Sequence, residues 1–155
     1  MKKYLWISVL VIVLDQITKY LASSQLDYAV PVAVMPMFNF TLLHNTGAAF
    51  SFLSDAGGWQ RWFFVVLALV ISIVLFVWLT RLKQHEKWIA ISLSLILGGA
   101  IGNVIDRFIF GYVIDFLDVY YNNWHWPAFN IADSAITVGA VVLILEGVLK
   151  KEEKA

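Results

Sequence analysis

Two aspartates are the residues of this sequence best suited to chemistry. Asp115 lies in the run Gly-Tyr-Val-Ile-Asp-Phe, and Asp133 lies in the run Phe-Asn-Ile-Ala-Asp-Ser. Both flank one short segment beside a long apolar stretch, where a carboxylate is costly and usually marks function. Two carboxylates held close together can share one proton, so that one accepts a proton from water while the other donates. The pair therefore indicates acid–base catalysis by two aspartates.

The composition of the 155-residue chain is typical of a membrane protein. Hydrophobic residues make up 61% of it and charged residues 14%, and there are seven tryptophans. The net charge of zero gives no reason to expect a nucleic-acid partner. No cysteine is present to form a disulfide or a thiolate nucleophile. The histidines, His44, His85 and His125, lack metal-ligand spacing, so we expect neither a metal site nor another cofactor.

Four apolar stretches have the length of membrane-spanning helices. The predicted helices cover about residues 4–22, 62–79, 88–105 and 131–149. Each is close to the roughly 20 residues that cross about 30 Å of hydrocarbon, where isolated strands could not satisfy their backbone. We expect loops at residues 23–61 and 106–130, and a single domain over residues 1–155. The first stretch also resembles a cleaved signal peptide, but Asp15 and Lys19 interrupt its apolar core, and we expect it to be retained.

The basic residues predict the orientation of these helices. Eight of the eleven Lys and Arg residues lie near the termini or in the short segment 80–87, whereas residues 23–60 and 108–130 contain none. Because cytoplasmic segments carry the excess of basic residues, both termini are expected on the cytoplasmic side of the membrane and both long loops on the outer side. Most of the unusual polar residues then gather at the outer face.

The first long loop shows the alternation of a β-strand. Phe38-Asn39-Phe40-Thr41-Leu42 alternates apolar and polar residues and is followed by turn residues, and a run containing Val30, Val32 and Val34 could pair with it. We therefore predict an all-α integral membrane protein. It would be a four-helix bundle with a small β-rich region on the membrane surface, in the loop between the first two helices.

Small and polar residues form a stripe on the third predicted helix. The positions spaced i, i+3, i+4 and i+7 are Gly99, Gly102, Asn103 and Asp106. Gly98 and Gly102 would let another helix approach closely, which is a structural role. An amide on the packed stripe needs hydrogen-bond partners, so Asn103 is a candidate for the site. Asp106 is expected to be held by Arg107 or by Lys19.

Two further polar pairs have structural interpretations. Asp15 and Lys19 are four residues apart on one helical face, so they are expected to form an ion pair. Asn130 and Asp133 have the spacing of a capping box at the start of the fourth helix. Capping alone would explain Asp133 if no other polar group were expected near it.

The expected convergence of polar residues at one depth leaves two functions open. The first is an intramembrane hydrolase in which Asp115 and Asp133 activate water, with Asn45, Asn103 and Arg107 nearby. The second is a small transporter or ion pathway lined by acidic residues, among them Asp15, Asp106 and Asp133. A transporter would show repeats, broken helices and polar groups near the membrane midplane. The polar groups here cluster at one face, which favours the hydrolase.

At these residues the chain resembles the bacterial lipoprotein signal peptidases, the signal peptidase II family. The resemblance covers essentially the whole chain and consists of five motifs in the family's order. They are Asp15-Gln16-Ile17-Thr18-Lys19, Asn45-Thr46-Gly47-Ala48-Ala49-Phe50, Gly98-Gly99-Ala100-Ile101-Gly102-Asn103-Val104-Ile105-Asp106-Arg107, Gly111-Tyr112-Val113-Ile114-Asp115-Phe116 and Trp126-Pro127-Ala128-Phe129-Asn130-Ile131-Ala132-Asp133-Ser134. Each motif alone is weak, but the ordered set on four spans is specific.

The resemblance implies an aspartic peptidase of the bacterial inner membrane, and it also implies a substrate. Such an enzyme removes signal peptides from prolipoproteins whose cysteine carries diacylglycerol, cutting immediately before that cysteine. By motif position, Asp115 and Asp133 would be the catalytic pair. Four residues would line the substrate site: Asn45, Asn103, Arg107 and Asn130. Asp15 would support them, while Lys19, Asp106 and Gly102 would be structural. The partners would be the prolipoprotein and membrane lipid, and the enzyme would be a monomer.

The first turn of a helix favours negative charge, which bears on the two aspartates. If Asn130 caps the fourth helix, Asp133 lies in that turn, and it would more often be the ionised member of the pair. The strand at residues 38–42 could also pair with an extended end of the signal peptide.

Overall fold

The structure is a computed structural model that describes residues 2–47 and 57–152. A short 3₁₀ turn, Lys2–Tyr4, precedes the first of four long helices. The helices are α1 (Leu5–Gln25), α2 (Trp59–Arg81), α3 (Lys87–Ile109) and α4 (Ile131–Glu152). By length and composition, all four could cross a membrane. The third helix continues past residue 105 to Ile109, so Asp106 and Arg107 lie in its last turn.

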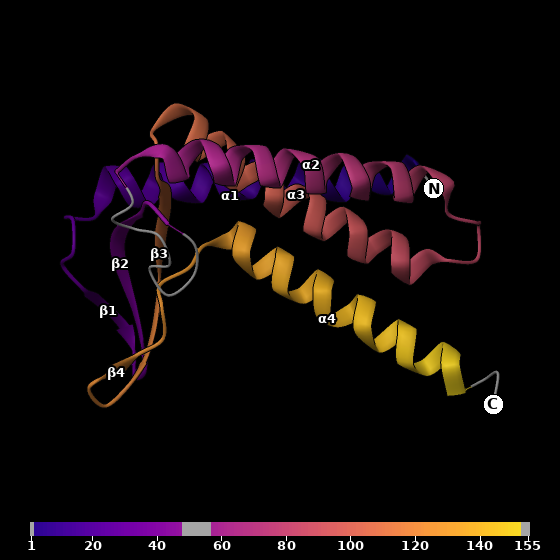
Figure 1. Ribbon diagram of the computed structural model, residues 1–155. Helices are drawn as coiled ribbons and strands as arrows, with labels where there is room; N and C mark the ends of the chain where they lie inside the picture. Colours follow the sequence, from indigo (N-terminus) through magenta and orange to yellow (C-terminus); the bar gives the residue numbers. More distant parts are fainter. Residues whose placement is uncertain (1, 48–56, 153–155) are drawn as a thin grey trace.

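Helix α3 is the centre of the bundle. It packs against α1, α2 and α4, and 61% of its apolar span is buried, compared with 17% for α2 and for α4. The start of α1 and the end of α4 lie at one end of the bundle, and a β-sheet lies at the other, which we call the sheet end (Figure 1). Helix α4 begins at the sheet end and diverges from the other helices towards its C-terminus (Figure 1). At the sheet end α1, α3 and α4 meet, because a Cβ atom at Gly102 of α3 would contact both Asp15 of α1 and Ala132 of α4.

Glycines on α3 allow this close meeting. A Cβ atom at Gly98 would lie 2.9 Å from the Cα of Ser8, and one at Gly102 would lie 2.6 Å from Asp15 Oδ2. Both positions therefore face α1, as expected for a pair of small residues at a helix contact. Gly99 faces α4, where an added Cβ would overlap the backbone carbonyl oxygen of Ala132.

The substitution Gly99→Ala is expected to lower the free energy of unfolding by about 1–3 kcal/mol, since the backbone of α4 must shift to admit a methyl group. Gly147→Ala on α4 is the matched control, because nothing lies within 4 Å of a Cβ there. That control is expected to be neutral or stabilising by up to about 1 kcal/mol. Thermal unfolding in detergent measures both variants, and equal melting temperatures would contradict the close packing of α3 on α4.

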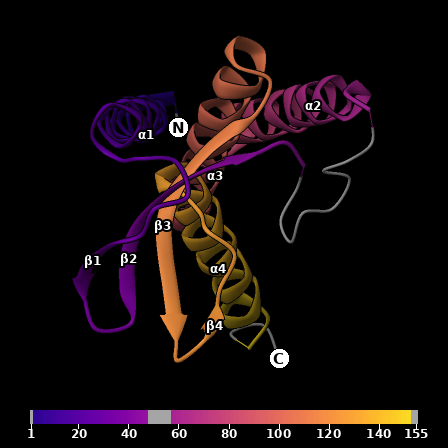
Figure 2. The same ribbon diagram turned by 90° about the vertical axis from the view of Figure 1, so that its left-hand side faces the viewer.

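The sheet has four antiparallel strands in the order β1-β2-β3-β4 (Figure 2). They are β1 (Val32–Met35), β2 (Phe38–Asn45), β3 (Val113–Tyr121) and β4 (Trp124–His125). The pairing of β2 with β3 joins the two long loops and sets Leu43 opposite Asp115. A small apolar core between the sheet and the helices contains Ala22, Leu42, Ile114 and Phe116. The sheet thus fixes Asp115 relative to the helix ends.

The sheet is more extensive than the sequence predicted. The strand at residues 38–42 and its pairing with the valine run are confirmed, because Val32 lies opposite Phe40. The four helices and the small β-region between the first two of them agree with the prediction, but the structure adds β3 and β4 from the second loop, so the fold is not all-α. Residues 113–116 of β3 are all buried, so this strand lacks the alternation that identifies a strand with one exposed face.

Candidate active site

Asp115 and Asp133 line the same cleft at the sheet end. Asp115 lies in β3 and is only 2% exposed, and Asp133 lies in the first turn of α4. The cleft has a volume of about 960 Å³. Its polar lining includes Asn45, Asn103 and Arg107, and its apolar lining includes Trp126, Phe129 and Val138. The structure therefore brings the two aspartates into one cavity that also has apolar walls.

The side-chain amide of Asn130 connects β3 to α3. Its Nδ2 donates to Asp115 Oδ1 at 2.7 Å and lies 3.2 Å from both Asn103 Oδ1 and the Ile114 carbonyl oxygen. Asn130 is fully buried, so these contacts are shielded from water. One amide thus holds the strand that carries Asp115.

Asn130 also forms the predicted capping box with Asp133. Its Oδ1 accepts a hydrogen bond from the Asp133 backbone N–H at 2.9 Å, and its own N–H donates to Asp133 Oδ2 at 3.3 Å. Both ends of the Asn130 side chain are therefore used: the oxygen starts α4, and the nitrogen binds Asp115. Because one residue serves both aspartates, it sets the position of one relative to the other.

A second path to Asp133 runs through Asn103 and Lys19. Asn103 Nδ2 donates to Asp133 Oδ1 at 2.7 Å, while Asn103 Oδ1 accepts from Lys19 Nζ at 3.0 Å. Since the ammonium group can only donate, it fixes which way the Asn103 amide points. Lys19 thereby directs the Asn103 N–H group at Asp133.

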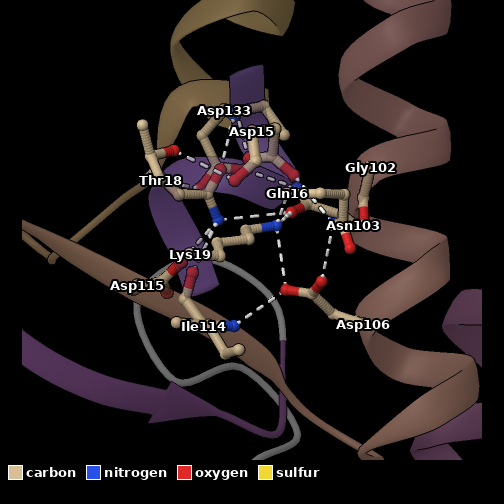
Figure 3. Close-up of polar contacts among 12 residues, drawn as sticks. Asp15, Gln16, Thr18, Lys19, Gly102, Asn103, Asp106, Ile114, Asp115 and Asp133 are labelled. Carbon is tan, nitrogen blue, oxygen red and sulfur yellow. Dashed lines mark hydrogen bonds and ion pairs between the residues drawn. The ribbon is translucent and has the colours of Figure 1, made fainter. Parts of the chain in front are cut away.

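Lys19 is itself held between two carboxylates. Its Nζ lies 2.9 Å from Asp15 Oδ2 and 2.9 Å from Asp106 Oδ2, and all three side chains are at most 2% exposed (Figure 3). The expected Asp15–Lys19 pair is confirmed, and of the two expected partners of Asp106, the structure selects Lys19. Arg107 instead donates to the Gly47 carbonyl oxygen at 2.9 Å.

The two carboxylates tie this ion cluster to the strand and the helix that carry Asp115 and Asp133. Asp15 Oδ1 accepts the backbone N–H of Ala132 at 2.9 Å, and Asp106 Oδ2 accepts that of Ile114 at 3.1 Å. One bond fixes the N-terminus of α4 just before Asp133, and the other fixes β3 just before Asp115. Negative charge at a helix N-terminus is favourable because of the helix dipole.

The remaining predicted residues lie on the loop side of the cleft. Asn45 Nδ2 donates to Asp115 Oδ2 at 3.1 Å, so both oxygens of Asp115 have an amide partner. Arg107 binds this segment through the Gly47 carbonyl oxygen, and its guanidinium carbon lies 5.2 Å from the ring centroid of Phe64. Ala48, Ala49 and Phe50, which complete the motif after Asn45, lie outside the described residues.

Sequence reasoning gave no role to Gln16 or His44. Gln16 Nε2 donates to Asp106 Oδ1 at 2.9 Å, and its place between Asp15 and Lys19 in the first motif was the available signal. The ring of His44 lines the cleft and stacks on Tyr112, with centroids 4.0 Å apart. Burial lowers the pKa of His44. No sequence pattern around His44 indicated that its ring stacks on Tyr112.

The electrostatic setting of Asp115 is that of a proton carrier. Burial, together with the nearby charge of Asp133, raises the pKa of Asp115 to about 7, although the amides of Asn45 and Asn130 oppose this rise. Asp115 can therefore hold a proton at neutral pH while its neighbour is ionised. Among residues 2–47 and 57–152, no group of three or more metal-ligating side chains occurs. The site can supply one acid and one base to a bound molecule.

Most of the chain is similar to lipoprotein signal peptidases of bacteria. The family model described as signal peptidase (SPase) II matches residues 7–149. A lipoprotein signal peptidase of Acinetobacter baumannii is 59% identical over 143 residues, which cover 92% of this chain and 81% of that protein. One from Pseudomonas aeruginosa is 55% identical over 145 residues, covering 92% of this chain and 86% of that protein.

The fold is also similar to solved structures. A bacterial membrane enzyme determined at 2.3 Å by the in meso method superposes with a TM-score of 0.89 at 31% identity, covering 100% of this chain and 93% of that one. A second such enzyme, at 1.9 Å, gives a TM-score of 0.81 at 33% identity, covering 94% and 92%. The match of the family model over nearly all of the sequence, with four apolar helices and a common fold, shows that this chain belongs to the signal peptidase II family of peptidases.

Proposed function

We propose that this protein is an aspartic endopeptidase that removes the signal peptide from diacylglyceryl-modified prolipoproteins, cutting immediately before the lipidated cysteine. The relatives are named lipoprotein signal peptidases, which supports the substrate class. The observation that carries the catalytic assignment is the pair Asp115 and Asp133 in one cleft, connected through Asn130. The Asn130 side chain that caps α4 at the Asp133 N–H also donates to the Asp115 carboxylate, and a purely structural cap does not require this second bond.

In the proposed mechanism Asp133 is the base and Asp115 the acid. Ionised Asp133 takes a proton from a water molecule as the water oxygen attacks the scissile carbonyl carbon, and protonated Asp115 donates to the carbonyl oxygen. Asp133 then passes its new proton to the leaving amine, while Asp115 takes a proton back from the tetrahedral intermediate. Asn103 stabilises the negative form of Asp133 through its 2.7 Å hydrogen bond.

The remaining residues would bind and orient the substrate. Asn45 and Arg107 line the cleft beside Asp115, where they can contact the peptide near the cleaved bond. The apolar wall that includes Trp126, Phe129 and Val138 can take acyl chains or the signal-peptide helix. Asp15, Lys19 and Asp106 stay out of contact with substrate and hold the catalytic elements, with Gly102 admitting Asp15.

The distribution of basic residues supports one orientation in the bacterial inner membrane. Lys and Arg concentrate at the end where both termini lie, so we assign that end to the cytoplasm and the sheet end to the outer face. There the cleft meets the headgroup region, where a lipidated cysteine would present its peptide bond. We further propose that the chain acts as a monomer and forms one domain.

The proposed function is tested with purified protein reconstituted in lipid. A diacylglyceryl-modified prolipoprotein should be cut to a product that begins at the modified cysteine, as read by mass spectrometry. The same prolipoprotein with an unmodified cysteine is the control and should remain uncut. Cleavage of both at equal rates, or at another bond, would refute the assigned specificity. Ion flux through the reconstituted protein without cleavage would support the transporter hypothesis.

The pH dependence should report the proton on Asp115. Because its pKa is raised to about 7, Asp115 keeps its proton below that pH and loses it above. We expect kcat/KM to fall about tenfold per pH unit above about pH 7, since the acid is then lost. Infrared titration of the substrate-free enzyme should show a carboxylic-acid band that disappears near pH 7 and is absent from Asp115→Asn. If the band is lost in Asp133→Asn instead, Asp133 is the acid and Asp115 the base.

A further inference from the structure

Strand β3 carries a second buried aspartate, Asp118, three residues after Asp115. Asp118 does not line the cleft. Asp118 is 5% exposed. Its Oδ2 accepts from Asn39 Nδ2 at 3.2 Å and from Thr41 Oγ1 at 3.0 Å, both on β2. Its Oδ1 lies 2.7 Å from Nδ1 of His125, on β4. One carboxylate therefore joins three strands, and the proposed mechanism does not use it.

The His125 bond closes the hairpin that β3 forms with β4. His125 lies opposite Tyr120 in the strand register, and their rings stack with centroids 5.3 Å apart. Strand β4 has only two residues, which is too short to be stable on its own backbone pairing. The hydrogen bond from His125 to the charged Asp118 carboxylate is stronger than one between neutral groups, and it holds the end of this strand in place. The hydrogen bonds that Asp118 accepts outweigh the effect of its burial and lower its pKa, so it is ionised at neutral pH.

The chain that leaves His125 becomes a wall of the cleft. Residues 126–129 run back along β3: the Trp126 N–H donates to the Val119 carbonyl oxygen at 2.9 Å, and Phe129 exchanges hydrogen bonds with Leu117. All four residues of this segment line the cleft. Between Trp126 and Phe129, Pro127 has no N–H to donate, so the wall depends on being held at its two ends.

The two ends of the wall are held differently. At the far end, Asn130 is fixed by its own bonds to Asp115, to Ile114 and to the first turn of α4. At the near end, the adjacent side-chain anchor is His125 on Asp118. We infer that Asp118 and His125 are positioning residues that hold the wall formed by residues 126–129 in place for the substrate. This inference rests on the proposed peptidase function of the cleft.

Because Asn130 is anchored independently, loss of the His125 bond should weaken substrate binding more than the chemical step. His125→Ala is expected to raise KM for the lipidated prolipoprotein about fivefold to tenfold and to change kcat less than about twofold. His125 is half exposed, so this variant should fold. His125→Asn keeps an N–H donor at nearly the position of Nδ1 and should restore KM to within about twofold of wild type.

Thr41→Val is the matched control, since it removes a bond to the same carboxylate from β2, away from the wall. Its KM should match that of wild type. In hydrogen exchange, the amides of Trp126 and Phe129 should lose protection in His125→Ala but keep it in Thr41→Val. An unchanged KM in His125→Ala, a failure of His125→Asn to restore it, or an equal rise in Thr41→Val would overturn the inference. If wild-type enzyme leaves the lipidated prolipoprotein uncut, the proposed function fails instead, while the exchange result still reports on the anchor.

Discussion

Replacing either Asp115 or Asp133 with asparagine should reduce kcat for prolipoprotein cleavage by roughly 10³-fold or more, because each variant removes one of the two proton-transfer groups of the proposed mechanism. Asparagine is close in shape to aspartate, and its side-chain oxygen can still accept the 2.7 Å bond that Asn130 gives to Asp115 or that Asn103 gives to Asp133. The loss should therefore be chemical and should leave the cleft in place. Rates of product formation from a lipidated prolipoprotein measure it.

Asp27→Asn is the control for the change in charge, since Asp27 is an exposed aspartate that follows α1 at the sheet end. It should cleave at the wild-type rate. Near-native activity in both Asp115→Asn and Asp133→Asn would contradict the proposal that these two aspartates are the catalytic pair.

The melting temperature of Asp115→Asn can distinguish a loss of catalysis from a loss of folding. The raised pKa of Asp115 means that the folded protein binds this proton more tightly than the unfolded chain does, so its contribution to stability declines as pH rises from about 4 to about 7. Asp115→Asn has no ionisable group at this position, so its stability does not decline with pH for this reason. Its melting temperature relative to wild type should therefore be higher at pH 8 than at pH 4, while its activity is lost at both.

The substitution Lys19→Met should lower the free energy of unfolding by about 3–5 kcal/mol, because it leaves the buried carboxylates of Asp15 and Asp106 without their shared cation. Methionine keeps much of the volume of the lysine side chain, so the loss is electrostatic. Activity should fall as well, since the Asn103 amide is no longer oriented by Lys19. Thermal unfolding in detergent and cleavage rates measure the two effects.

Lys87→Met is the matched control for Lys19→Met, since Lys87 is an exposed lysine at the start of α3. It should change the melting temperature little. Adding Asp106→Asn to Lys19→Met should recover part of the stability, because one uncompensated charge is removed. If Lys19→Met and Lys87→Met unfold at the same temperature, the ion cluster does not stabilise the fold.

Features that depend on neighbours in sequence could be predicted. The four helices follow from their apolar length, the Asp15–Lys19 pair from a spacing of four, and the capping box from the spacing of Asn130 and Asp133. These patterns are local, and each reflects the geometry of one helix. Long-range partners were predictable only as alternatives: the choice of Lys19 over Arg107 for Asp106 depends on where α1 crosses α3.

Features that depend on burial from both sides were missed. Strand β3 carries Asp115 and Asp118 within a run that is buried on both faces, so its sequence shows neither alternation nor a uniformly apolar run. Gln16 and His125 were likewise passed over, because their roles depend on Asp106 and Asp118, and these contacts link separate elements of the fold. The sheet had to be seen before either contact could be recognised.

The hydrogen bond from Ala132 to Asp15 joins the last helix to the first across 117 residues of sequence. A ribosome delivers α1 and α3 before α4, so Asp133 and its capping residue reach the membrane only after Asp15, Lys19 and Asn103 are already there. A chain interrupted before α4 would lack the base of the proposed mechanism. Under that mechanism, the order of synthesis alone keeps such an unfinished protease latent.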